Sequence, residues 1–157
     1  MIALERYEHG ICCVESISIA FEYRISHMNC IQSTFLVVDD EPLVLKYIAS
    51  ILRRMGCNQV LEAENASLAA EVLQKNEISV LVSDITLPDG DGRILAANLL
   101  ETNPTAVVVL ITGFDASEVQ ISPGIRERVR LLQKPFTPDD VSELLGAELS
   151  VQPRVIA

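Results

Sequence analysis

Short apolar runs alternate with amphipathic stretches of helical period over residues 34–150, and five such pairs follow one another. Runs this short fit strands that are buried on both faces. Strands that alternate with helices form a parallel sheet between helices, so the pattern predicts an α/β fold with a five-stranded, doubly wound parallel sheet. The expected strands are TFLVVD, NQVLEA, EISVLVSD, TAVVVLITG and VRLLQKPF.

Helices are expected between and after these strands. Pro42 suits the first position of a helix, and Gly56 suits its end. In contrast, Pro123 and Gly124 interrupt residues 114–129, which predicts a short or irregular fourth helix there. The clear helices are expected at residues 42–56, 66–76, 93–101 and 137–149.

The chain of 157 residues is long enough for one domain with a hydrophobic core. Residues 1–33 show no clear period and no turn signals, which predicts an N-terminal extension that is disordered or lies upstream of the true start. The domain itself is expected at residues 34–150. A short tail at residues 151–157 leaves no room for a second domain.

Charge and hydropathy exclude several classes of partner. The formal net charge is −10, which argues against nucleic acid or an anionic membrane as a direct partner. The longest apolar run, residues 106–111, is far shorter than the ~20 residues of a membrane-spanning helix. Glu5 and Glu8 stand where a signal peptide carries positive charge. These features predict a cytoplasmic protein, and its four cysteines, which lack zinc-site spacing, are expected to be free thiols.

Polar side chains stand at the ends of four of the expected strands, and in chain order they are Asp39 and Asp40, Asp84, Thr112 and Lys134. Parallel strands bring their carboxyl ends to one edge of the sheet, where ligands bind. Neighbouring carboxylates repel one another and are costly to bury unpaired, so this edge calls for a cation. An oxygen-only site that is open to water suits Mg2+, with the lysine as a fixed positive partner.

The same groups are those that transfer of a phosphoryl group to a carboxylate requires. The carboxylate attacks phosphorus, while a metal ion and an ammonium neutralise charge on the equatorial oxygens. A hydroxyl donates a hydrogen bond to one of these oxygens. The set therefore predicts a site at which an aspartate accepts a phosphoryl group.

Four motifs, each at the end of an expected strand, resemble the receiver domain of two-component response regulators: VVDDEP, SDITLPDGDG, LITG and LLQKPF. The spacing is similar too, because Pro88 lies four residues after Asp84 and Lys134 lies 22 after Thr112. The resemblance covers residues 34–150. It implies the flavodoxin-like strand order 2-1-3-4-5.

The resemblance implies a role for each site residue. Asp84 would be the phosphoacceptor, Thr112 the switch hydroxyl, and Lys134 the lysine that pairs with the phosphoryl group. The bond from Lys134 to Pro135 would be cis. The cofactor would be Mg2+, held by Asp39, Asp40, Asp84 and the main-chain carbonyl of Thr86.

The implied function is a phosphorelay signalling switch. A sensor histidine kinase or a histidine phosphotransfer protein would donate a phosphoryl group to Asp84, and slow hydrolysis would reset the domain. The domain would catalyse both reactions on itself without being a classical enzyme. It would be a stand-alone receiver without an output domain, acting on an unknown downstream protein. Leu131 stands where the family often has an aromatic residue, so coupling from the site to the surface is expected to be weak or to follow another route.

Other interpretations fit parts of the pattern. The segment PDGDGR suggests a calcium loop, but Ile94 stands where that loop needs glycine. A phosphatase of the haloacid dehalogenase type would need an acid in place of Thr86. A receiver-fold module that binds a protein without phosphate remains the alternative, and incubation with acetyl phosphate and Mg2+ discriminates the two.

Overall fold

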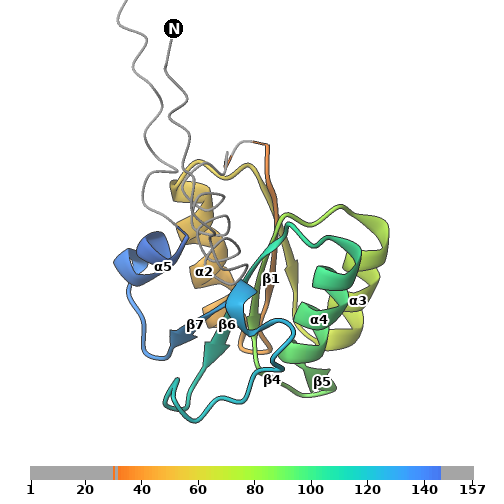
Figure 1. Cartoon of the computed structure of the whole chain (residues 1–157). Helices are drawn as coiled ribbons and strands as arrows, with labels where there is room; N and C mark the ends of the chain where they lie inside the picture. Colours follow the sequence, from red (N-terminus) through yellow and green to blue (C-terminus); the bar gives the residue numbers. More distant parts are fainter. Residues whose placement is uncertain (1–29, 31, 146–157) are drawn as a thin grey trace, which may run out of the picture.

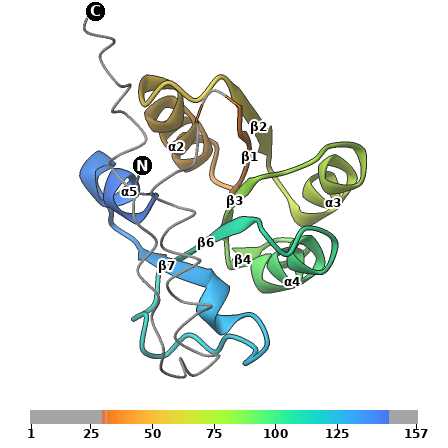
Figure 2. The ribbon, with the colours of Figure 1, turned by 45° about the horizontal axis from the view of Figure 1, so that its top comes forward.

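Five parallel strands form the central sheet of the computed structural model, which describes Cys30 and residues 32–145. Their order across the sheet is β2-β1-β3-β6-β7 (Figures 1 and 2). Strands β6 and β7 are the fourth and fifth strands of this sheet, because β4 and β5 form a separate hairpin. The order is therefore the predicted 2-1-3-4-5, and the predicted fold class is confirmed. The strands are β1 (Thr34–Val38), β2 (Gln59–Ala63), β3 (Val80–Asp84), β6 (Val107–Thr112) and β7 (Val129–Gln133).

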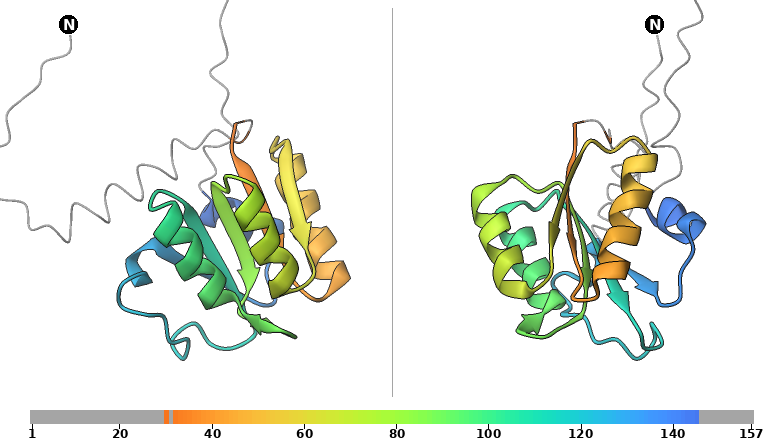
Figure 3. Two further views of the ribbon diagram at one scale, coloured as in Figure 1. Left: turned by 90° about the vertical axis from the view of Figure 1, so that its right-hand side faces the viewer. Right: turned by 180° about the vertical axis from the view of Figure 1, so that it is seen from behind.

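Helices cover both faces of the sheet, because successive strand residues point to opposite sides and both sides are apolar. Phe35, Val82 and Ile111 are buried under α2 (Pro42–Arg54) and α5 (Pro138–Leu144). On the other face, buried strand residues such as Leu36 and Leu110 pack under α3 (Ala66–Lys75) and α4 (Gly92–Thr102). Figures 2 and 3 show these two helical layers on opposite sides of the sheet.

The ends of the helices follow the expected signals. Pro42 is the first residue of α2, and Gly56 follows its end with a φ of 91°, a conformation that favours glycine. Thr137 caps α5 in a capping box with Asp140, whose carboxylate accepts a hydrogen bond from the Thr137 N–H. The predicted C-terminal part of this helix, residues 146–149, lies outside the described residues.

The segment between β6 and β7 is irregular, as the sequence predicts. Within the described part of the chain it contains one short 3₁₀ helix, η1 (Arg126–Arg128), and no α-helix. Ile121 is nevertheless buried and belongs to the core cluster under α3 and α4. The segment therefore covers its part of the sheet without forming a regular helix.

Two features were not expected from the sequence. A small antiparallel hairpin joins β4 (Thr86–Leu87) to β5 (Gly90–Asp91) directly after β3. Cys30 and Cys57 form a disulfide, so the expectation of free thiols is wrong for these two cysteines. Of the predicted extension at residues 1–33, residues 1–29, with Cys12 and Cys13, and residue 31 lie outside the described residues, as does the tail at residues 151–157. No helix of the described chain is both long enough and apolar enough to cross a membrane.

Candidate functional site

The site lies where β1, β3, β6 and β7 end. Asp39 follows β1, Asp84 is the last residue of β3, Thr112 is the last residue of β6, and Lys134 follows β7. Asp84 pairs with Ile111 in the sheet register. The Lys134 N–H donates to the Thr112 carbonyl at 2.7 Å. The backbone pairing of neighbouring strands thus brings these residues to one edge of the sheet.

Three carboxylates meet at this edge. Asp39, Asp40 and Asp84 each offer an oxygen atom, and these atoms lie within 4.8 Å of one another. Asp39 is fully buried, Asp84 is 8% exposed, and Asp40 is exposed to solvent. A cluster of hard oxygen atoms with one solvent-facing member suits a small divalent cation that keeps part of its water.

The buried Asp39 carboxylate has one oxygen atom without a hydrogen bond. Its Oδ1 accepts a hydrogen bond from the Glu41 N–H at 2.9 Å. Its Oδ2 has no hydrogen-bond partner, although the Lys134 Nζ lies 3.2 Å away. Burial raises the pKa of Asp39, and the Glu41 N–H and the Lys134 charge only partly oppose this. A buried carboxylate oxygen without a hydrogen bond fits a cation ligand, so the donor set agrees with the Mg2+ that the resemblance implies.

Lys134 is the cation that the structure supplies. Its Nζ lies 2.6 Å from Asp84 Oδ2 and 3.3 Å from Glu41 Oε1. Burial alone lowers the pKa of Lys134, but the hydrogen bond to Asp84 and the charges of Asp39 and Asp84 outweigh it and raise the pKa. The ammonium is therefore charged at neutral pH. The contact with Glu41 was missed in the sequence, although Glu41 directly follows the two aspartates. The Lys134–Pro135 bond is cis, as predicted.

Both carboxylate oxygens of Asp84 have a donor. Its Oδ1 accepts from the Thr86 N–H at 2.7 Å, and its Oδ2 accepts from the Lys134 ammonium at 2.6 Å. The Asp84 main chain is equally constrained. A Cβ atom at Gly92 would lie 2.1 Å from the Asp84 carbonyl oxygen, so the backbone approach requires glycine at that position.

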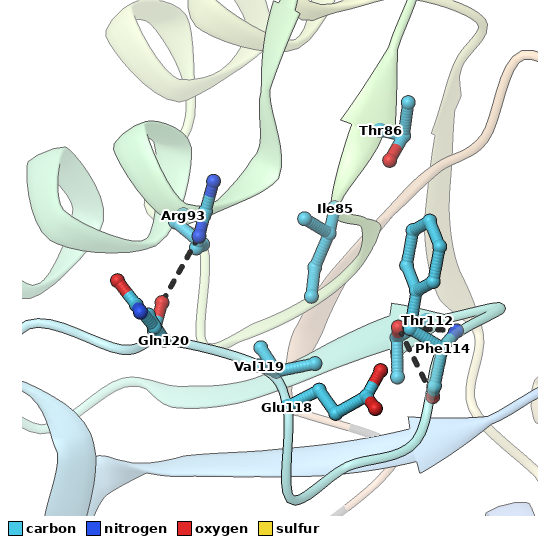
Figure 4. A pocket seen from close by; sticks show the side chains of 8 residues that line it. All are labelled: Ile85, Thr86, Arg93, Thr112, Phe114, Glu118, Val119 and Gln120. Carbon is cyan, nitrogen blue, oxygen red and sulfur yellow. Dashed lines mark hydrogen bonds between the residues drawn. The ribbon is translucent and has the colours of Figure 1, made fainter.

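Thr112 is one of the residues that line a cavity of about 360 Å³ (Figure 4). Its buried Oγ1 accepts from the Phe114 N–H at 2.9 Å. The Phe114 side chain is 66% exposed. The residues that line the cavity are Ile85, Thr86, Arg93, Thr112, Phe114, Glu118, Val119 and Gln120.

The amino-acid sequence is similar to those of response regulators. The response regulator receiver domain model matches residues 35–145. The probable transcriptional regulatory protein TcrX of Mycobacterium tuberculosis is 34% identical over 116 residues, which cover 74% of this chain and 49% of that protein. A chemotaxis protein CheY homologue of Campylobacter jejuni is 32% identical over 116 residues, which cover 70% of this chain and 87% of that protein. The chain thus spans about half the length of TcrX and most of the CheY homologue.

Solved structures of receiver domains are similar to this chain as well. A response regulator receiver domain protein of Clostridium thermocellum matches with a TM-score of 0.64 and 26% identity, covering 74% of this chain and 94% of that one. The receiver domain of the hybrid histidine kinase CckA matches with a TM-score of 0.61 and 28% identity, covering 74% of this chain and 99% of that one. The chain therefore belongs to the response regulator receiver domain family.

Proposed function

We propose that this domain is a phosphorelay signalling switch that accepts a phosphoryl group on Asp84 in a Mg2+-dependent reaction. The observation that carries the proposal is the Asp84 carboxylate itself. It lies 2.6 Å from a charged lysine and within 4.8 Å of two further carboxylates, one of which has a buried oxygen without a hydrogen bond. A nucleophile, a fixed cation and a set of metal ligands thus stand together at one strand edge.

Each residue has a proposed role. Asp39, Asp40, Asp84 and the main-chain carbonyl of Thr86 would hold Mg2+. When bound, the ion would supply positive charge that stabilises the negative charge on the phosphoryl oxygens during the transfer. Lys134 pairs with a phosphoryl oxygen, and its contact with Asp84 keeps the ammonium next to the reacting carboxylate. The Thr112 hydroxyl donates a hydrogen bond to another phosphoryl oxygen, which requires the hydroxyl to give up the weak bond of 3.4 Å that it donates to the Phe114 carbonyl.

The proposed donor is a phosphohistidine on a sensor histidine kinase or a histidine phosphotransfer protein. A carboxylate oxygen of Asp84 attacks phosphorus, the phosphorus–nitrogen bond breaks, and the imidazole leaves with the bonding electron pair. The product is an aspartyl phosphate, which water later hydrolyses to restore the carboxylate and release phosphate. The phosphorylated domain would act on a downstream protein.

Phosphate uptake separates this proposal from a phosphate-independent binding module. The protein is incubated with acetyl phosphate and Mg2+ and its intact mass is measured, with a matched sample in EDTA. We expect one added phosphoryl group in Mg2+ and none in EDTA. Asp84→Asn should take up none, whereas Asp139→Asn, on the exposed first turn of α5, should behave as wild type. Uptake by Asp84→Asn, or none by wild type, would overturn the proposal.

A cytoplasmic location stays a prediction, which fractionation of the source cells tests. A transcriptional role is named for TcrX, of which this chain spans about half.

A further inference from the structure

The side chain of Asp89 attaches the β4–β5 hairpin to the start of α3. Its Oδ1 accepts from the Ala66 N–H at 2.7 Å. Its Oδ2 accepts from the Ser67 N–H at 2.9 Å and from the Ser67 hydroxyl. Asp89 lies 22 and 23 residues from these partners, so the contact joins two separate elements.

Asp89 completes the hydrogen bonding of the α3 N-terminus. The first four N–H groups of a helix have no partner within the helix beyond its N-cap. Here the Asn65 Oδ1 accepts from the Leu68 N–H at 2.8 Å, and the Ala69 N–H makes the first regular helical bond, to the Asn65 carbonyl at 3.1 Å. Asp89 accepts from the N–H groups between them and the N-cap, those of Ala66 and Ser67, and its negative charge suits the positive end of the helix dipole.

A second observation places the hairpin directly against α3. Gly90 follows Asp89, and a Cβ atom there would lie 2.7 Å from the Cβ of Ala66. Contacts this short are not tolerated, so the glycine allows the hairpin backbone to pack on the helix. The docking thus depends on close packing as well as on the carboxylate.

The hairpin in turn orients the phosphoacceptor. Thr86 is its first residue and pairs with Asp91 across it. The Thr86 N–H donates to Asp84 Oδ1 at 2.7 Å, while the Lys134 ammonium takes the other oxygen. The base of the hairpin is closed by the Gly92 N–H, which donates to the Ile85 carbonyl at 2.9 Å. A shift of the hairpin would therefore move the group that fixes Oδ1 of Asp84.

We propose that Asp89 is a positioning residue for the phosphoryl-accepting site. It docks the hairpin on α3 and thereby holds Thr86, whose N–H orients Asp84 and whose carbonyl is the proposed Mg2+ ligand. The inference rests on the proposed function and extends it to a residue that contacts neither metal nor phosphoryl group. The Ser67 hydroxyl and the N–H groups of Ala66 and Ser67 lower the pKa of Asp89, so the carboxylate is charged at neutral pH.

The test compares two ways of weakening the same helix end. Asp89→Ala removes the link between hairpin and helix. Asn65→Ala removes a cap of the same helix and leaves the link in place, so it is the matched control. Asp89→Asn keeps one acceptor oxygen and should restore part of the function. The Mg2+ dissociation constant is measured by calorimetric titration, the melting temperature by circular dichroism, and the amide chemical shifts of Asp84 and Thr86 by NMR.

We expect Asp89→Ala to weaken Mg2+ binding by about tenfold, the low end of what loss of a residue supporting a metal ligand costs. The Thr86 amide resonance should shift in the same variant. Asn65→Ala should lower the melting temperature and leave the Mg2+ dissociation constant within about twofold of wild type. Asp89→Asn should give an intermediate dissociation constant.

The inference is overturned if Asp89→Ala and Asp89→Asn bind Mg2+ as wild type does. It is also overturned if Asn65→Ala weakens Mg2+ binding as much as Asp89→Ala, because the effect would then be one of helix stability alone. Failure of the proposed function has a different signature, since wild type would then bind Mg2+ and take up no phosphoryl group.

Discussion

At the scale of single residues, the Asp39 carboxylate is a proposed metal ligand, and its burial makes the charged form costly for the folded state. Burial raises its pKa above the ordinary value of 3.8. Over the interval between 3.8 and the raised value, the folded state therefore binds more protons than the unfolded state. Stability is consequently lost as the pH rises through this interval, and the loss is complete above the folded pKa. The negative charge of Asp39 thus destabilises the metal-free fold, and it stands where a bound cation would compensate for it.

Asp39→Asn should therefore stabilise the metal-free protein. We expect the free energy of unfolding at pH 7 to rise by about 1 kcal/mol, a size typical of point substitutions. The advantage over wild type should shrink as the pH falls through the Asp39 pKa. Urea denaturation in EDTA at several pH values measures this. A variant that is less stable than wild type at pH 7 would show that the Lys134 contact outweighs the burial.

Thr86 and Phe114 bear on how long the aspartyl phosphate survives. Both line the cavity beside Thr112, and the exposed Phe114 ring has no hydrogen-bonding group. Hydrolysis needs a water molecule held in line behind phosphorus, and side chains with amides or acids can hold it. Neither residue is of that kind. We therefore predict a phosphoprotein that is long-lived compared with fast chemotaxis receivers, which suits storage or back-transfer in a phosphorelay.

The lifetime prediction is tested by the decay of phosphorylated protein after the donor is removed. The double variant Thr86→Asn, Phe114→Glu should decay about tenfold faster than wild type, which corresponds to ~1.4 kcal/mol in the barrier. Asp139→Asn serves as the control with an unchanged lifetime. Equal decay of wild type and double variant would mean that these two positions do not set the lifetime.

At the scale of elements, the segment between β6 and β7 begins at the site, so a change at Thr112 on phosphorylation would reach the surface through it. The Thr112 hydroxyl accepts from the Phe114 N–H at the start of this segment. Leu131 in β7 is partly buried against the core cluster under α3 and α4. A leucine has no polar end that would follow the movement of Thr112, so phosphorylation is expected to shift β7, α5 and the irregular segment only modestly.

Amide chemical shifts with and without beryllofluoride and Mg2+ test this expectation. Small changes are expected over residues 113–145 in wild type. Leu131→Tyr should give larger ones, because a ring with a hydroxyl end can follow the threonine. Absence of any change on this face in wild type would favour the phosphate-independent binding module.

The regular elements could be predicted because their physical signals are local. Both faces of β1 and β6 are buried, so each strand is a continuous apolar run. The irregular segment could be predicted from Pro123 and Gly124. The β4–β5 hairpin could not be, because its strands have two residues each and carry no period.

The site could be predicted in outline because parallel strands end at one edge, which brings Asp39, Asp84 and Lys134 together. Asp39 Oδ2 lies 3.2 Å from the Lys134 ammonium without forming a hydrogen bond to it, and no sequence pattern encodes the angle at which the lysine approaches. The contact of Asp89 with α3 was missed for a related reason. Its partners lie 22 and 23 residues away, and a carboxylate in a loop has no sequence signature for such a contact.

At the scale of the whole molecule, the disulfide of Cys30 and Cys57 joins the residues before β1 to the turn after α2. Both cysteines are buried. A chain that begins at Met28 keeps Cys30, so it should retain the melting temperature and phosphate uptake of the full chain. A chain that begins at Gln32 loses the disulfide and should be less stable by about 3 kcal/mol. Thermal unfolding of the three chains measures both effects. A large loss of stability in the chain from Met28 would show that the upstream residues pack on the domain.

The central claim, that Asp84 accepts the phosphoryl group, is tested most directly by locating the modified residue. The protein is phosphorylated with acetyl phosphate and Mg2+ and then treated with borohydride, which reduces an aspartyl phosphate to homoserine. Its peptides are sequenced by mass spectrometry. The account predicts homoserine at position 84 and unchanged aspartate at positions 39 and 40. Homoserine at position 39 or 40, or none at position 84, would contradict it.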